Sequence, residues 1–399
     1  MSSECPFRLC SVYVPRIKKQ YVPRMKKKNM DKNKENLFLL LSAALWEKGN
    51  VAQRVKDVDW NAVRRLAMEQ YLMGVVADTF PMLSEAQCGK EERWKWMGYV
   101  LNLQKHNQRM NVLVGKLFRK FHDMGLQPVL MKGQAFAANY PEPLHRHCGD
   151  IDIYFKNRTD CAKAVAWAGK VDPAAAESSD NKRERRHFTF SVEKNIVELH
   201  YFMCLFENKR LNCRLQEVID EEFARSEPFL VDIAGEQTET VPPTLSVLHQ
   251  IIHIARHLLE AGIGLRQLCD LALYLDRHYD ELDKVRLQKC LEELELQTVA
   301  EALGHILVNN LGLDACKLPF GTNGQYAGFI LNEIFEGGNF GKKKTEYQKK
   351  KNGWSRKLQS VMYFYRRCKT YQPLFPSEAK SYFRNKICLN IKLLATHHC

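Results

Sequence analysis

The sequence lacks any hydrophobic run close to the roughly 20 residues that a membrane-spanning helix requires. The longest candidate, residues 37–45, is too short and precedes a polar segment. No apolar segment with a small-residue cleavage site follows the basic N-terminal stretch, so we expect no secretory signal. These absences argue against a membrane or secreted protein.

Paired cysteines are also absent. The 13 cysteines are scattered singly and no C-x-x-C motif occurs, a pattern typical of reduced thiols rather than of a disulfide framework. Hydrophobic residues make up 45% and charged residues 27% of the 399 residues, which is an ordinary globular composition. We therefore expect a soluble cytoplasmic protein that has no disulfides and no membrane partner.

The net charge is +14, and much of it lies near the two ends of the chain. Basic runs attract polyanions by counterion release, but solvated basic tails are common, so a nucleic-acid partner is only weakly supported. Residues 13–20 recur almost unchanged as residues 21–28. We interpret residues 1–33 as a disordered basic arm that could precede the true start codon. The basic runs are residues 16–19, 24–28, 342–344 and 349–351.

The periodicity of apolar residues divides the remaining chain into three parts. Helical spacing predicts an N-terminal helical region at residues 34–123. The period then changes toward two, which predicts an α/β core at residues 124–240. Pro242 and Pro243 begin a C-terminal helical region at residues 241–399, which ends in a basic tail.

Individual elements follow from the same patterns. A long helix is predicted over residues 91–121, and another over residues 287–311. Two strands, 187–193 and 196–202, are predicted to form a hairpin that turns at Lys194 and Asn195. Further strands are predicted at residues 128–131 and 150–155.

Asp150 and Asp152 interrupt an apolar strand that also contains Ile151 and Ile153. Because successive strand side chains point to opposite faces, both carboxylates lie on one face. Two adjacent like charges repel and lose hydration unless a cation lies between them. Mg²⁺ binds one or two carboxylates and leaves its other positions to phosphates and water. The pair therefore predicts a Mg²⁺ or Mn²⁺ site.

Glu198 and His200 interrupt the second strand of the predicted hairpin and share a face of it. If this strand packs beside the Asp150 strand, Glu198 becomes a third acid at the metal site. Three acids with two divalent ions are a common arrangement for nucleotidyl transfer. The alternative is that Glu198 is an exposed residue paired with a Lys or Arg.

Lys132 and Gly133 end the strand that precedes the acids. Glycine lets a backbone approach a phosphate closely, and Lys132 could meet an oxygen of a nucleoside triphosphate (NTP). A lysine at a strand end is, however, often only solvated.

Together these residues resemble the nucleotidyltransferase superfamily related to DNA polymerase beta, with its strand-end glycine, Asp-x-Asp and later third acid. More closely, the chain resembles the uncharacterised nucleotidyltransferase family of bacterial proteins. The resemblance spans about residues 36–311, although Gln134 stands where Ser or Gly usually follows the glycine. The matching segments are Leu130-Met131-Lys132-Gly133, Tyr140-Pro141, Arg146, Asp150-Ile151-Asp152, Val197-Glu198-Leu199-His200 and Gly264-Leu265-Arg266-Gln267-Leu268-Cys269-Asp270.

Several other residues have two possible roles. Arg146 could bind a phosphate bidentately or pair with Glu142 or an aspartate. Arg266 and His200 are possible residues of the substrate cleft. Arg266 could face that cleft, as the resemblance suggests, or form a simple i,i+4 pair with Asp270. His253 and His257 have a spacing compatible with a metal, but their apolar neighbours favour packed or hydrogen-bonded histidines.

The resemblance implies an α+β fold: the minimal nucleotidyltransferase mixed sheet, flanked by N-terminal and C-terminal helical regions. It implies metal-dependent transfer of a nucleoside monophosphate from an NTP to an acceptor hydroxyl or phosphate on a small molecule, sugar, RNA end or protein. Asp150, Asp152 and Glu198 are the expected metal ligands and catalytic residues, and Lys132, Gly133 and Arg146 the nucleotide-binding residues. The alternatives are an antitoxin-like module that binds a nucleotide or partner without turnover, and a basic RNA-binding protein.

Overall fold

The structure is a computed structural model that describes residues 31–178, 180, 186–260, 262–337, 362–363 and 365–395, with side chains described as far as Lys386. Residues 1–30 of the expected basic arm lie outside the described residues, whereas residues 31–33 begin the first helix. The late lysine runs at residues 342–344 and 349–351 also lie outside the described part.

The chain begins with helices that are capped by aspartates. Asp31 accepts a hydrogen bond from the backbone N–H of Asn33 at the start of α1, and Asp59 caps α3 in the same way through Ala62. These caps satisfy N–H groups that have no partner within the helix. The N-terminal helices are α1 (Lys32–Leu45), α2 (Gly49–Ala52), α3 (Trp60–Glu69), α4 (Met73–Ala77) and the long α5 (Lys90–Asp123).

A six-stranded mixed sheet follows, with the strand order β3-β4-β2-β1-β6-β5. Strands β2 and β4 are parallel neighbours, as are β1 and β6, whereas the other neighbouring pairs are antiparallel. A mixed sheet among many helices confirms the predicted α+β fold. The strands are β1 (Pro128–Leu130), β2 (Asp150–Phe155), β3 (His187–Val192), β4 (Asn195–His200), β5 (Phe229–Ile233) and β6 (Glu236–Thr240).

The two faces of the sheet differ in chemistry. Ile151, Ile153, Val197 and Leu199 are fully buried in a core that β2 and β4 share with α5 and with α7 (Arg158–Val171). The alternate residues of both strands, which carry the acids, therefore lie on the opposite face. The shorter connecting helices are α6 (Gln134–Ala137), α8 (Pro173–Glu177) and α10 (Lys209–Arg225).

The C-terminal part is helical, but the single helix predicted over residues 287–311 is wrong. It is broken at Glu295, whose backbone has a positive φ of 57°. The break is stabilised by a tertiary contact, because the Glu295 carboxylate accepts hydrogen bonds from the backbone and hydroxyl of Ser377. The helices are α11 (Pro243–Glu260), α12 (Leu265–His278), α13 (Lys284–Glu293), α14 (Gln297–Asn309), α15 (Ala327–Gly337) and α17 (Pro376–Ala395).

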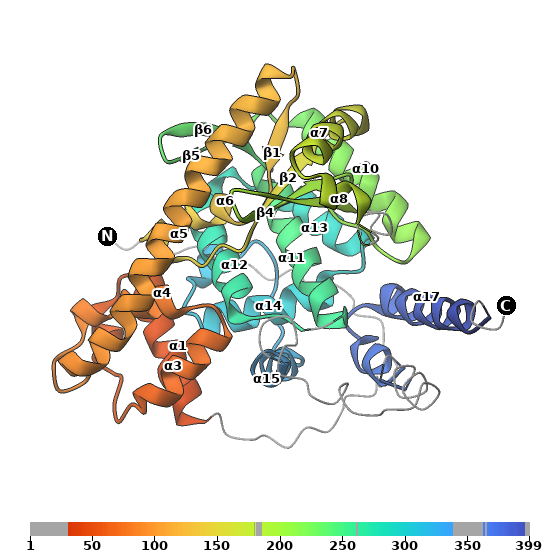
Figure 1. Cartoon of the computed structure of the whole chain (residues 1–399). Helices are drawn as coiled ribbons and strands as arrows, with labels where there is room; N and C mark the ends of the chain where they lie inside the picture. The colour runs from red at the N-terminus through yellow and green to blue at the C-terminus, as the bar shows by residue number, and fades with distance from the viewer. Residues whose placement is uncertain are drawn as a thin grey trace, which may run out of the picture.

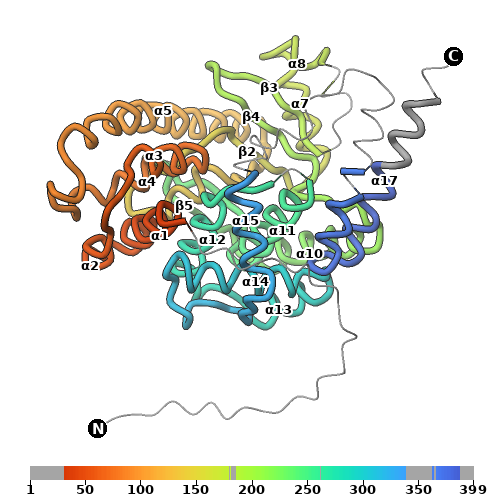
Figure 2. Tube along the Cα trace, turned by 90° about the horizontal axis from the view of Figure 1, so that it is seen from below, coloured from red at the N-terminus to blue at the C-terminus, as the bar shows by residue number. Residues whose placement is uncertain are grey.

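The N-terminal and C-terminal helices pack into one continuous core (Figure 1). The side chain of Gln70 is buried between them: it accepts from the backbone N–H of Leu265 at 2.8 Å and donates to the carbonyl of Ile334 at 3.2 Å. Trp46 donates to the carbonyl of Leu311 at 2.6 Å. Figure 2 shows the N-terminal helices beside α12, α14 and α15. The division of the chain into separate domains stays a prediction.

Neither a membrane-spanning helix nor a disulfide occurs among the described residues. None of the described helices combines the length and the apolar character that a membrane crossing requires. The nine described cysteines are free thiols, seven of them buried.

Candidate active site

The structure brings the three expected acids together. Strands β2 and β4 run parallel in a register that places Asp152 directly beside Glu198. Asp150 lies two residues before Asp152 on the same face of β2, and a carboxylate oxygen from each of the three acids lies within 4.8 Å of the others. The parallel pairing of β2 with β4 thus supplies the contact that the sequence pattern left conditional.

Asp150 and Asp152 differ in how much positive charge lies near their carboxylates. The charge of Asp152, together with burial, raises the pKa of Asp150 to about 6. Burial alone would raise the pKa of Asp152 too, but the charge of Lys132 and a hydrogen bond from His200 bring it well below its ordinary range. Asp152 is therefore ionised at neutral pH, and Asp150 is the acid that lacks sufficient positive charge nearby.

Lys132 and Gly133 lie at the end of β1, next to the acids. The ammonium of Lys132 donates to Asp152 at 2.8 Å. Burial disfavours its charge, but the neighbouring Asp152 and Asp150 more than compensate and raise the pKa of Lys132. Gly133 has a positive φ of 54°, and a Cβ at this position would lie 3.3 Å from the carbonyl oxygen of Asp150. Only glycine fits this turn without strain.

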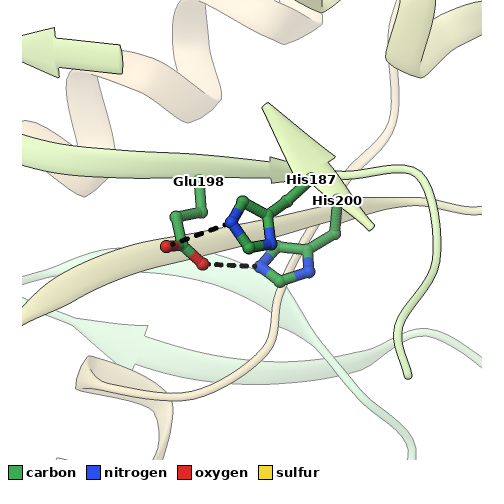
Figure 3. Close-up of side chains that lie close together, drawn as sticks. All are labelled: His187, Glu198 and His200. Atoms are coloured by element: carbon green, nitrogen blue, oxygen red, sulfur yellow. Dashed lines mark ion pairs between the residues drawn. The ribbon is translucent and has the colours of Figure 1, made fainter. Parts of the chain in front are cut away.

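His200 and a residue that the sequence analysis missed, His187, both lie next to the carboxylate of Glu198 (Figure 3). Nε2 of His200 lies 2.9 Å from Asp152 and 3.3 Å from Glu198, and Nε2 of His187 lies 3.5 Å from Glu198. The predicted turn at Lys194 and Asn195 is wrong by one residue.

The turn residues are Glu193 and Lys194, both with the positive φ that a type I′ turn needs. His187 consequently pairs with His200 across the hairpin. With the turn predicted from the sequence, its partner would be Phe202. The hairpin register is therefore the signal that could have identified His187.

Arg146 forms an ion pair with an aspartate, which was one of its two sequence readings. Its Nε and Nη2 donate to the two carboxylate oxygens of Asp270 at 3.1 and 2.7 Å, and Tyr140 donates to the same carboxylate at 2.7 Å. Arg146 also lines the cavity beside the acids. Its contact with a phosphate stays a prediction.

Arg266 lies on α12 and also lines this cavity. Its Nη1 donates to the carbonyl of His147 at 2.5 Å, and its charge acts to lower the pKa of Asp150. Among the described hydrogen bonds, Asp270 accepts from Arg146 and Tyr140, so the simple i,i+4 pair with Arg266 does not form. Arg266 is therefore a cation beside the acids.

The cavity has a volume of about 250 Å³ and lies between the acidic face of the sheet and helices α11 and α12. His249, His253 and His257 line it from successive turns of α11, with ring centroids 6.3 and 4.3 Å apart. Burial lowers the pKa of all three, to about 3 for His249 and about 4 for His257. They are neutral at pH 7 and add no charge to the cavity.

The donor atoms of the acids suit a divalent cation. Asp150, Asp152 and Glu198 offer only carboxylate oxygens, which are the ligands that Mg²⁺ and Mn²⁺ prefer. The raised pKa of Asp150 shows that the acids repel one another, and a cation between them would relieve that repulsion. These residues therefore fit such an ion.

Comparison with known proteins identifies the family. A family model described as uncharacterised nucleotidyltransferase matches residues 56–312, which include the sheet, the three acids and helices α11 to α14. No curated protein and no solved structure matches the chain significantly. The family match covers more than half of the sequence. The chain belongs to the uncharacterised nucleotidyltransferase family, and it is a nucleotidyltransferase.

Proposed function

We propose that this enzyme transfers a nucleoside monophosphate from an NTP to an acceptor hydroxyl or phosphate and releases pyrophosphate, with Mg²⁺ or Mn²⁺ as cofactor. The observation that carries the proposal is the convergence of Asp150, Asp152 and Glu198 within 4.8 Å of one another at one cavity. The acceptor is a small molecule, a sugar, an RNA end or a protein side chain.

The residues around the acids have complementary roles in this proposal. Asp150 and Asp152 hold the divalent ion, which supplies positive charge to the triphosphate and to the leaving pyrophosphate. Lys132 and Arg266 add fixed positive charge for the phosphate oxygens. Gly133 lets the triphosphate approach the backbone, because no side chain occupies the space beside the Asp150 carbonyl.

Glu198 is the group that can accept a proton from the acceptor. Its carboxylate is partly exposed, whereas that of Asp152 is buried and bonded to Lys132. The acceptor oxygen forms a bond to the α-phosphorus as the bond from that phosphorus to the bridging oxygen breaks. Pyrophosphate leaves with the electron pair, and Glu198 takes the acceptor proton. Glu198 also serves as the third ligand of the cation site.

We also place the enzyme in the cytoplasm. The nine described cysteines are free thiols, which suits a reducing compartment. Cell fractionation with an antibody to the chain tests this placement, and recovery from an oxidising compartment would contradict it.

Isotope position tests the proposed reaction directly. The purified enzyme is incubated with Mg²⁺, cell extract and an NTP labelled at either the α- or the γ-phosphate. Nucleotidyl transfer predicts a labelled acceptor from the α-labelled NTP only and labelled pyrophosphate from the γ-labelled NTP, both above the level of extract alone, and neither when Asp150 and Asp152 are both changed to Asn. The exposed Asp123, at the end of α5, provides the control variant Asp123→Asn. Transfer of the γ-label to an acceptor by the wild type, and not by the double variant, would identify phosphoryl transfer and refute the proposal.

A further inference from the structure

The hairpin of β3 and β4 brings two imidazoles to one carboxylate. His187 and His200 are directly paired across the strands, and Glu198 lies two residues before His200. All three side chains therefore project from one face of the hairpin. Figure 3 shows Glu198 beside the two rings, with one carboxylate oxygen toward each. Its Oε1 lies 3.5 Å from His187 and its Oε2 lies 3.3 Å from His200.

These separations match those between ligands of one metal ion. Ligand bonds of about 2.0–2.2 Å in a tetrahedral site put neighbouring ligand atoms roughly 3.3–3.6 Å apart. The ligand atoms of His187, Glu198 and His200 all lie within 4.8 Å of one another. The described polar contacts of His200 all use Nε2, the nitrogen that faces the carboxylates. Little movement is needed for the three side chains to share an ion.

The chemistry of this set differs from that of the acids on β2. Carboxylate oxygens alone suit Mg²⁺ and Mn²⁺, whereas imidazole nitrogens favour transition metals such as Zn²⁺ and Co²⁺. Two histidines and one carboxylate also leave coordination positions open for water or substrate. Glu198 belongs to both groups and can join two ions.

We propose that His187, Glu198 and His200 form a site for one divalent transition-metal ion, next to the Mg²⁺-type site of Asp150 and Asp152. The proposal concerns metal binding by the hairpin and does not depend on which reaction the enzyme catalyses. When both sites are filled, Glu198 bridges them. The enzyme then has one site for an ion that prefers oxygen ligands and one site for an ion that prefers nitrogen ligands.

Cobalt absorption tests this site without an assay of turnover. Metal-free protein is titrated with Co²⁺ alone, and the visible absorption of the bound ion is recorded. The expected result is one equivalent of Co²⁺ in a nitrogen-containing site, displaced by Zn²⁺ but not by a large excess of Mg²⁺. His187→Gln is expected to weaken Co²⁺ binding at least about tenfold, since even indirect partners of metal ligands contribute about 10–100-fold.

Three comparison variants identify the residues that bind Co²⁺. Asp150→Asn is expected to keep the Co²⁺ spectrum, even though it removes Mg²⁺-dependent NTP binding. The proposed metal site of the hairpin and the proposed nucleotidyl transfer can therefore fail separately. His253→Gln tests whether Co²⁺ binds instead to the histidines of α11. The exposed His122 on α5 provides the control His122→Gln. Thermal unfolding of each metal-free variant shows whether it is folded. Unchanged Co²⁺ affinity in folded His187→Gln, loss of the spectrum in His253→Gln, or displacement of Co²⁺ by excess Mg²⁺ would overturn the proposal.

Discussion

Arg146 and Asp270 form a buried, two-pronged ion pair that ties the loop before β2 to helix α12. The two residues are 124 positions apart in the chain, and their side chains are almost completely inaccessible to solvent. Tyr140 adds a third hydrogen bond to the same carboxylate. This contact fixes the acid-bearing strand relative to the helix that carries Arg266.

Breaking this pair should destabilise the protein strongly. We expect Asp270→Ala to lower the free energy of unfolding by about 3–5 kcal/mol, because it leaves a buried, unpaired guanidinium. The double variant Arg146→Met/Asp270→Leu should recover most of that loss, since neither charge then remains buried. Urea denaturation of the single and double variants measures both effects. Equal losses in the two variants would show that the charge is not the cause.

Asp150 should make the metal-free protein less stable at neutral pH than at acidic pH. Its pKa is raised from 3.8 to about 6 in the folded state, so the unfolded chain gives up this proton at lower pH. The folded state is therefore penalised increasingly from about pH 4 to about pH 6, and fully above that range. Two pKa units correspond to about 3 kcal/mol at most.

Asp150→Asn should accordingly stabilise the metal-free protein by about 1–3 kcal/mol near pH 7.5 and by little near pH 4. Chemical denaturation at the two pH values measures the difference, with Asp123→Asn as the control. Added Mg²⁺ should reduce the difference in unfolding free energy between Asp150→Asn and the wild type, because the ion stabilises the wild type. A gain of equal size at both pH values would contradict the proposed repulsion.

Gly133→Ala should separate the geometry of the site from the stability of the turn. The backbone conformation alone, with φ 54° and ψ −109°, costs an L-residue about 1–3 kcal/mol. Gly125 also has a positive φ, 72°, but has open space where the Cβ would lie, so Gly125→Ala is the matched control.

Only Gly133→Ala should also displace the Asp150 carbonyl and lower nucleotidyl transfer, on the order of 10–100-fold. Denaturation and transfer assays on both variants test this difference. Full activity in folded Gly133→Ala would show that close approach at this glycine is not needed.

The acidic faces of the strands could be predicted from local sequence, because period two is a property of the extended backbone. Ile151, Ile153, Val197 and Leu199 are buried, and the acids share the other face. The pairing of β2 with β4 could not be read with the same certainty, since it depends on contacts between distant segments. The same holds for Asp270 as the partner of Arg146.

Where the prediction failed, a distant contact outweighed the local pattern. Nothing near Glu295 signals a helix end, since no glycine or proline occurs there. Its positive φ is supported by Ser377, 82 residues later in the chain. In the β3–β4 hairpin, a turn placed one residue too late hid the pairing of His187 with His200. Such errors are small in sequence but decide which side chains meet.

A nucleotide site built on Asp150 and Asp152 is tested most directly by a thermal-shift panel of the four NTPs, each with and without Mg²⁺. The wild type is compared with Asp150→Asn/Asp152→Asn and with the control Asp123→Asn. We expect at least one NTP to stabilise the wild type and the control only when Mg²⁺ is present, and the double variant to lose this shift. Absence of an NTP-dependent shift in the wild type, or an equal shift in the double variant, would contradict a nucleotide site built on these acids.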